Sequence, residues 1–139
     1  MRALVLDPHR EKWGDHSLVF TQEEKFWETV WAARHCVVVC EEASTTLRRD
    51  REFMPAFTRI RHNHHKLIVV GHSGTDLLPG MRAQIGTLYL FLQSKRAAEI
   101  WAETMADPRI LEAQNLRQFE FLKKEAYQTP RKQTLSLNA

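Results

Sequence analysis

Short apolar runs alternate along this chain with segments whose apolar residues follow helical spacing. The apolar runs cover residues 2–6, 37–40, 67–71 and 87–91. Runs of this length without alternation are typical of strands that are buried on both faces of a parallel sheet. The amphipathic segments between them supply helices that would cover such a sheet. The pattern therefore predicts an α/β protein, a three-layer sandwich with a mainly parallel sheet.

Capping residues set the expected helix boundaries. Thr21 and Glu24 form a capping-box pattern, which predicts a helix that continues to about Arg34. A second helix is expected over residues 97–105, because an apolar stripe there ends before an Asp-Pro pair.

Length and composition are those of one globular domain. The 139 residues are 43% hydrophobic and 27% charged, which are ordinary globular values. We expect a single domain over residues 1–139, with a core at residues 1–109 and a basic C-terminal extension at residues 110–139. In the extension the pattern predicts a short helix near Ile110 and then a strand pair that turns at Thr129-Pro130.

Net charge and cysteine content say little about the partners and the cellular location of the protein. The net charge of +3 permits contact with nucleic acid. Cys36 and Cys40 fall on one face of a predicted buried strand, so we expect apolar core residues rather than a disulfide. No segment has the apolar length of a signal peptide or a membrane span. These features predict a cytoplasmic protein without a membrane partner.

The strand at residues 37–40 runs directly into two carboxylates, Glu41 and Glu42. Apolar residues followed by acids describe a buried strand whose carboxyl end faces the crevice where open α/β sheets bind ligands. The next strand is followed by His72 and Ser73, so we expect these polar side chains to lie near the carboxylates. A core strand that merely ends in surface acids is the alternative interpretation.

The succession of these motifs resembles the core of FtsK–HerA type P-loop motor ATPases, the group of DNA translocases and phage packaging ATPases. Residues 4–8, Leu-Val-Leu-Asp-Pro, resemble the second strand of that family, and residues 37–42 resemble its Walker B strand. The resemblance implies that Asp7 takes part in cofactor binding, that Glu41 holds Mg through water, and that Glu42 polarises the attacking water. The family usually has Asp at the position of Glu41.

The same resemblance assigns roles to residues further along the chain. His72 or Ser73 stands where the family has a polar sensor that hydrogen-bonds the γ-phosphate or the attacking water. Arg82 lies in the segment before the family's fifth strand, in which an arginine contacts phosphate or a neighbouring subunit. The likeness covers residues 2–105 in unbroken order.

The P-loop of this family does not occur in the sequence. No Gly-x-x-x-x-Gly-Lys-Ser/Thr pattern is found in the 139 residues, and such a loop cradles phosphates with backbone N–H groups and a lysine. By the resemblance, the first strand, the P-loop and the first helix would lie before Met1. We therefore expect a partial or degenerate ATPase of phage or mobile-element origin, linked to DNA translocation or packaging. Alone it would be inactive and bind ATP and Mg weakly, and a P-loop-bearing chain, a second copy or DNA would be its partner.

The expected sheet consequently has an empty position. In the family the strands lie in the order five, one, four, three, two, so strand one separates residues 67–71 from residues 87–91. We expect these two strands to pair directly, or the place to be filled by a C-terminal strand, a second copy or a partner. If residues 2–6 lay there instead, residues 7–17 would be a degenerate phosphate loop.

Other functions compete with this one. A non-enzymatic nucleic-acid or protein-binding module would use the basic turn at residues 59–66 and the basic tail. An acid–base site of another hydrolase would use Glu41, Glu42 and His72, although no nucleophile motif accompanies them. Imidazole is a common metal ligand, so a metal site competes with a solvated turn as the interpretation of His62, His64, His65 and His72.

Overall fold

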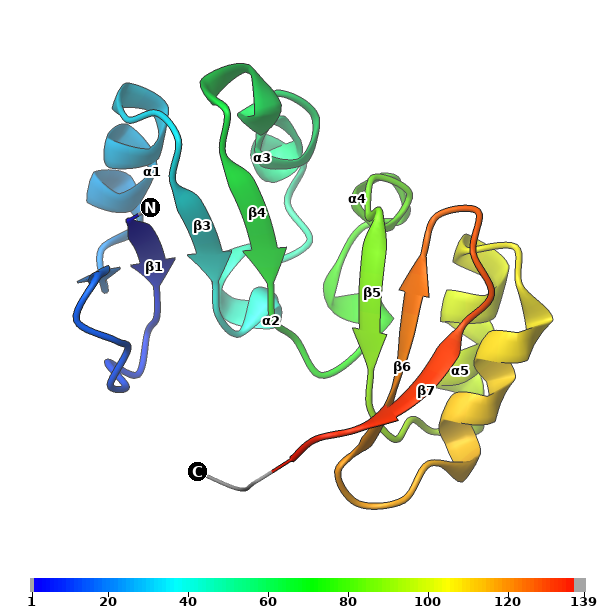
Figure 1. Cartoon of the computed structure of the whole chain (residues 1–139). Coiled ribbons are helices and arrows are strands. Elements are labelled where there is room, and N and C mark those ends of the chain that lie inside the picture. The colour runs from blue at the N-terminus through cyan, green and yellow to red at the C-terminus, as the bar shows by residue number, and fades with distance from the viewer. Residues whose placement is uncertain (1, 137–139) are drawn as a thin grey trace. The chain divides into compact units, whose positions relative to one another are not determined.

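Two compact units make up the chain, residues 1–81 and residues 82–139. The computed structural model describes residues 2–136, and Figure 1 shows their helices and strands. Each unit has its own sheet and is described by itself. The expectation of one domain with a core that ends at residue 109 stays a prediction. Within the described residues, no helix is long and apolar enough to cross a membrane.

The first unit is built on a four-stranded parallel sheet in the order β2-β1-β3-β4. Val5 pairs with Val19 on one side and with Val39 on the other, and Val39 in turn pairs with Ile68. The α/β class and the mainly parallel sheet expected from the sequence are confirmed. The strands are β1 (Ala3–Leu6), β2 (Ser17–Phe20), β3 (Val37–Cys40) and β4 (Lys66–Val69).

Burial explains why the central strands of this sheet are continuous apolar runs. Val5 of β1 and Cys40 of β3 are fully buried. Helix α1 (Glu23–Ala32) adds Phe26 and Val30, neither of which is exposed. Cys40 is a free thiol whose pKa burial raises to about 12. It is therefore a core residue, as the sequence predicts.

Short helices and 3₁₀ turns connect the strands of the first unit. Pro55 lies in the first turn of its helix, where the missing N–H of proline has no intrahelical partner to lose. The elements between β3 and β4 are α2 (Ala43–Thr46), η1 (Arg51–Phe53), α3 (Met54–Thr58) and η2 (Ile60–Asn63). After β4 come η3 (Gly74–Asp76) and α4 (Pro79–Arg82).

The second unit is a three-stranded antiparallel sheet in the order β5-β6-β7 with helices packed against it. Leu88 of β5, Trp101 of α5 and Ile110 of η4 share one hydrophobic cluster. The predicted short helix near Ile110 and the strand pair that follows it are both formed. The elements are β5 (Thr87–Leu90), α5 (Lys95–Thr104), η4 (Pro108–Asn115), β6 (Glu120–Glu125) and β7 (Arg131–Thr134).

The strand at residues 87–91 belongs to the antiparallel sheet, which decides against one of the alternatives given for the empty position. β5 pairs antiparallel with β6 and forms no ladder with β4. Direct pairing of residues 67–71 with residues 87–91 is therefore wrong, and β4 pairs only with β3 among the described strands. Because β1 lies between β2 and β3, the condition for a degenerate phosphate loop at residues 7–17 is not met.

The start of α1 also differs from the prediction. Residues 17–20 form strand β2, in which the N–H of Asp7 donates to the carbonyl of Phe20 at 3.0 Å. The chain leaves this ladder only after Phe20, so Gln22 rather than Thr21 precedes the helix, and no side chain caps it. The helix ends at Ala32 rather than near Arg34.

A buried carboxylate links two elements of the second unit. The side chains of Asp107 and Lys124 are 5% and 8% exposed, and Lys124 Nζ lies 3.2 Å from Asp107 Oδ2. The guanidinium of Arg109 donates to Asp107 and holds the pKa of this carboxyl well below its usual range. Lys124 Nζ also donates to the carbonyl of Gln128.

Replacing Asp107 with Asn is expected to lower the free energy of unfolding by about 3–5 kcal/mol near neutral pH, because the buried Lys124 ammonium loses its charge partner. The pKa of Asp107 is lowered by folding, so its contribution is present above its unfolded pKa of about 4. The contribution is lost as the pH falls toward the folded pKa. Urea unfolding of both proteins near neutral pH and at about pH 3 measures the difference.

Glu125→Gln is the matched control for this prediction. Glu125 pairs with Lys123 at 3.6 Å, and both side chains are more exposed than those of the buried pair. Such surface pairs contribute at most about 1 kcal/mol. Equal losses of unfolding free energy in the two variants would contradict a structural role for the buried pair.

Candidate active site

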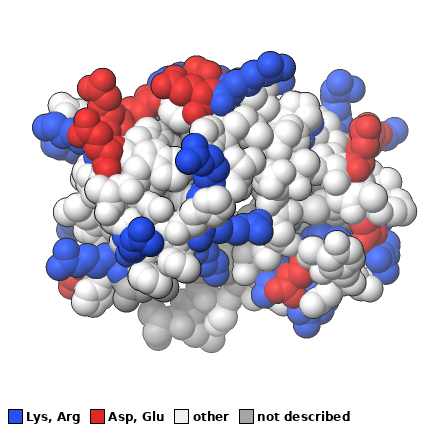
Figure 2. Space-filling view, turned by 90° about the horizontal axis from the view of Figure 1, so that it is seen from above, with Lys and Arg blue, Asp and Glu red and all other residues white. Residues whose placement is uncertain are grey.

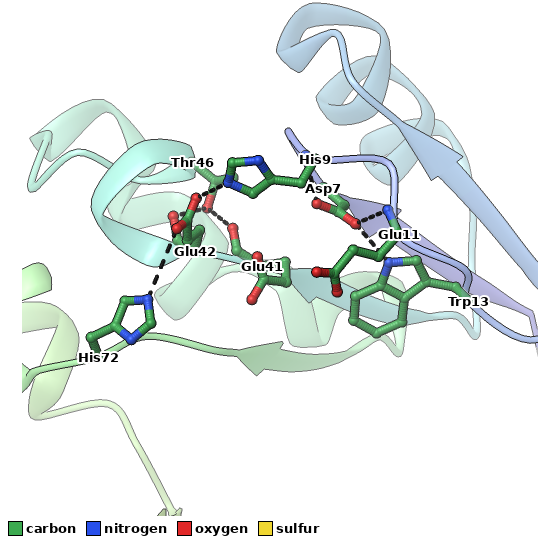
Figure 3. A network of polar contacts seen from close by, with 8 residues as sticks. All are labelled: Asp7, His9, Glu11, Trp13, Glu41, Glu42, Thr46 and His72. Atoms are coloured by element: carbon green, nitrogen blue, oxygen red, sulfur yellow. Dashed lines mark hydrogen bonds and ion pairs between the residues drawn. The ribbon is translucent and has the colours of Figure 1, made fainter.

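Three loops meet at one edge of the parallel sheet because three neighbouring strands end there. The loops cover residues 7–13, 41–46 and 70–76 and follow β1, β3 and β4. The register places Leu6 beside Cys40 and Cys40 beside Val69, so the three loops begin at the same level. Figure 3 shows the polar network that results.

Asp7 organises the first of these loops. It is 1% exposed, and its carboxylate accepts hydrogen bonds from the N–H of His9 and of Glu11 at 2.8 Å and from Trp13 Nε1 at 2.9 Å. Burial raises the pKa of Asp7, but these hydrogen bonds outweigh it and hold the pKa below its ordinary value. Both carboxylate oxygens thus serve the loop, and the predicted role of Asp7 in cofactor binding stays a prediction.

Glu42 occupies the turn between β3 and α2 in a left-handed conformation, with φ 51° and ψ 68°. Such a conformation is uncommon for a residue with a side chain, and it persists where the surroundings fix it. The N–H groups of Thr45 and Thr46 donate to the carbonyl of Glu42, and Thr46 Oγ1 donates to the carbonyl of Glu41 at 2.9 Å. These bonds set the direction in which both carboxylates leave the strand.

Two histidines from the flanking loops meet the carboxylate of Glu42. His9 Nε2 lies 2.6 Å from Oε2, and His72 Nε2 lies 3.9 Å from Oε1. The hydrogen bond and the charge of Glu42 raise the pKa of His9. Glu42 keeps 28% of its side chain exposed. The proximity of Glu42 and His72 expected from parallel strands is therefore present, and the chemical roles of both stay predictions.

Glu41 is surrounded by other carboxylates. Burial raises its pKa, and the charges of Asp7, Glu42 and Glu11 raise it further. Carboxylate oxygens are the ligands that Mg²⁺ prefers, often with several waters retained, so the donor chemistry at this edge fits the ion. Among residues 2–136, no group of three or more His, Cys, Asp or Glu side chains is arranged to hold a metal ion. The role of Glu41 as a magnesium ligand through water stays a prediction.

The loop after β4 uses Ser73 differently from His72. Ser73 Oγ accepts from the N–H of Thr75 at 3.3 Å and caps η3. Asp76 Oδ2 accepts from the N–H of His72 and of Ser73 at 3.0 and 3.1 Å. The hydroxyl of Ser73 therefore serves its own loop, whereas His72 reaches Glu42. Sequence reasoning missed Asp76 as the residue that shapes this loop.

Of the four histidines considered for a metal site, His72 takes part in this network, whereas His65 has partners elsewhere among the described residues. Arg82 is the first residue of the second unit, so its predicted contact with phosphate stays a prediction. His65 is buried, and its Nδ1 accepts from the N–H of Cys36 at 3.0 Å while its Nε2 donates to the carbonyl of Val30 at 2.8 Å. His65 thus has a structural role, and the described residues provide no metal site for the histidine run.

His9 is the functional candidate that sequence reasoning missed. It lies two residues beyond Asp7, in a loop that the sequence marks only as polar. Its contact with Glu42 joins residues 33 positions apart. The only signal in the sequence is a histidine shortly after the Asp-Pro that ends a strand, next to a strand that ends in acids.

Solved structures of genome-packaging NTPases have a similar fold. The genome packaging NTPase B204 from Sulfolobus turreted icosahedral virus 2, in complex with ATP-γS, matches 99% of this chain and 84% of its own with a TM-score of 0.76. The sequences are 15% identical. The same protein in complex with AMPPCP gives a TM-score of 0.78 at 14% identity over the same shares of both chains.

A third similar structure is B204 from Sulfolobus turreted icosahedral virus, a DNA-packaging ATPase. It gives a TM-score of 0.75 at 14% identity and covers 98% of this chain and 84% of its own. Identities this low establish a shared fold alone. No known family profile and no curated protein matches the sequence.

The contact between His9 and Glu42 can be tested by titrating the His9 ring. Because the carboxylate raises the pKa of His9, the charged pair is present below that raised pKa and is lost as the pH rises through it. NMR titration of the His9 ring is expected to give a pKa above the ordinary value of about 6.5. Glu42→Gln is expected to return the pKa of His9 toward that value.

Asp15→Asn is the control, since Asp15 is an exposed carboxylate in the same connection between β1 and β2. It is expected to leave the His9 titration unchanged. A His9 titration that does not respond to Glu42→Gln would show that the contact is absent in solution.

Proposed function

We propose that this chain is the Walker B-bearing part of a viral or mobile-element packaging ATPase and hydrolyses ATP once a P-loop segment joins its sheet. The observation that carries the proposal is the position of Glu42 at the carboxyl end of β3, between His9 and His72. Ligands of open α/β sheets bind at that edge. The likeness to B204, which is solved in complex with ATP-γS and AMPPCP, supports ATP as the nucleotide.

The residues at the carboxyl edge of the sheet have different roles in the proposed hydrolysis. Glu42 orients and polarises the attacking water, and His9 and His72 fix its carboxylate on either side. Glu41 would hold Mg through water, and the ion would supply positive charge to neutralise the phosphates. His72, whose Nε2 lies 3.9 Å from the Glu42 carboxylate, would act as the polar sensor. Asp7 holds the loop that places His9.

The free side of β4 is where a P-loop segment would join the sheet. The N–H groups of Lys66 and Val70 donate to the carbonyls of Cys36 and Cys40 at 3.0 Å, on the side of β3. Alternation in a parallel ladder turns the N–H and C=O groups of Leu67 and Val69 to the other side. Among the described strands, none pairs with β4 on that side.

Apolar side chains flank these unpaired groups. Ile68 and Val70 are 40% and 41% exposed, although the strands at the centre of the sheet are covered on both faces. An edge strand with apolar side chains is a template for a further strand. Since a P-loop follows directly on a strand, we assign this side of β4 to that strand, whether it belongs to the same polypeptide or to another.

Supplying a strand–P-loop–helix segment in trans is expected to produce Mg-dependent ATP hydrolysis, whereas we expect none from the chain alone. Glu42→Gln is expected to lower the turnover by about 10²–10⁴-fold, because an amide cannot take up the proton of the attacking water. Asp15→Asn is the control and should retain full turnover. A segment that docks but gives no hydrolysis, or hydrolysis that survives Glu42→Gln, would contradict the assignment.

Docking itself is tested by proline substitutions on the two outer strands. Val69→Pro removes an N–H from the free side of β4 and is expected to abolish docking and hydrolysis. Val19→Pro makes the equivalent change on β2, the opposite outer strand, and should leave both intact. Amide hydrogen exchange of Leu67 measures docking directly, since its N–H becomes protected when a strand pairs there. Equal effects of the two prolines would contradict a specific role for β4.

A further inference from the structure

The amino ends of β1, β3 and β4 form the edge of the sheet opposite to Glu41 and Glu42, and this edge is basic. Residues 2–3, 33–37 and 60–66 build it and contain no Asp or Glu. The carboxyl edge, in contrast, carries Asp7, Glu41 and Glu42. Four exposed cationic side chains stand at the amino ends and are here called the basic edge: Arg2, Arg34, Arg61 and Lys66.

Main-chain hydrogen bonds hold the three segments of this edge side by side. The N–H of Val37 donates to the carbonyl of Arg2, and the N–H of Lys66 donates to the carbonyl of Cys36, both at 3.0 Å. The N–H of His35 donates to the carbonyl of Asn63 at 3.0 Å. The residues of the basic edge are thus neighbours in space although they are up to 64 positions apart, from Arg2 to Lys66.

Side chains fix the same segments further. Asn63 Nδ2 donates to the carbonyls of Trp31 and Ala33 at 2.9 and 3.2 Å. The rings of His35 and His64 stack with centroids 4.8 Å apart and an interplanar angle of 5°. A surface whose backbone is already ordered loses less entropy when a ligand binds.

The cations of the basic edge have no acidic partner. Within residues 2–136, none of these four side chains takes part in an ion pair. In the space-filling view of the end at which β3 and β4 begin, blue Lys and Arg side chains stand apart across the left half (Figure 2). The red carboxylates of that half gather mostly along its upper border.

We infer that the basic edge binds the phosphate backbone of nucleic acid. Three of its four cations are arginines, whose planar guanidinium groups form bidentate hydrogen bonds with phosphate oxygens. They stand at the ends of three adjacent strands, which span about 10 Å, and so form a row suited to a linear polyanion. Proteins that lie on anionic membranes usually present a helix with apolar side chains beside its cations, whereas these cations stand at strand ends.

This inference goes beyond the proposed hydrolysis and does not depend on it. The carboxylates of the catalytic edge lie at the other ends of the same strands. Duplex binding through the basic edge therefore needs neither nucleotide nor a P-loop segment.

Fluorescence anisotropy of the full chain with a labelled random-sequence duplex, without nucleotide, tests the inference. The logarithm of the binding constant is expected to fall with the logarithm of salt concentration with a slope of about −3 to −4, as four phosphate contacts require. Arg34→Gln combined with Arg61→Gln should lower the affinity at least about 10-fold and reduce the slope by about 2. Arg2→Gln combined with Lys66→Gln is a second pair with the same expected effect, should the first fail to fold.

Arg131→Gln combined with Lys132→Gln is the matched control, because it removes the same net charge from β7 in the second unit. Its affinity should stay within about 2-fold of the parent chain, since non-specific attraction alone is a weak, long-range effect. An equal loss in both double variants would overturn the inference, because net charge rather than the basic edge would then govern binding.

Two further arms complete the test. Sedimentation with vesicles of phosphatidylserine and phosphatidylcholine should show no binding that depends on the basic edge. Vesicle binding lost in the Arg34/Arg61 variant, without duplex binding by the parent chain, would overturn the inference in favour of a membrane surface. Glu42→Gln should bind duplex as the parent does, so a failure of the proposed hydrolysis and a failure of this inference give different results.

Discussion

The parallel register of β1, β3 and β4 is the constraint on which the first unit depends. Val5 pairs with Val39, and Val39 pairs with Ile68. Because Val5 and Val38 are completely buried, a slip of one residue would turn apolar side chains from one covered face to the other and break the packing on both. The register fixes which residues leave the strands at each edge, and with them the acidic and the basic ends of the sheet.

Much of this sheet is predictable from the sequence for a simple physical reason. Strands buried on both faces need uninterrupted apolar residues, so residues 2–6 and 37–40 are recognisable without any neighbour. Residues 67–71 carry the same apolar run, although Ile68 and Val70 are partly exposed at the edge of the sheet. The position of Glu41 and Glu42 follows from the same pattern, since parallel strands deliver their carboxyl ends to one edge. Strand β2 is not recognisable in this way because Leu18 and Val19 are largely exposed, and its pairing depends on β1 rather than on burial.

The details of the site depend on interactions that no local pattern contains. His9 meets Glu42 because three hydrogen bonds to Asp7 shape the intervening loop. Ser73 turns to its own loop because Asp76 gathers the N–H groups there. The pairing of β5 is equally non-local, since its apolar run suits a parallel strand as well as the antiparallel ladder that it forms with β6. Sequence reasoning therefore finds the carboxylates and His72 but misses His9 and Asp76.

The central claim is that Glu42 directs water at a bound nucleotide from the carboxyl end of β3. The most direct measurement is a crystal structure of the chain with a docked P-loop segment, Mg and a non-hydrolysable ATP analogue. The expected result has the Glu42 carboxylate within hydrogen-bonding distance of a water in line with the γ-phosphate, about 2.6–3.2 Å away. A nucleotide bound at another part of the chain, or a Glu42 side chain directed away from the γ-phosphate, would contradict the claim.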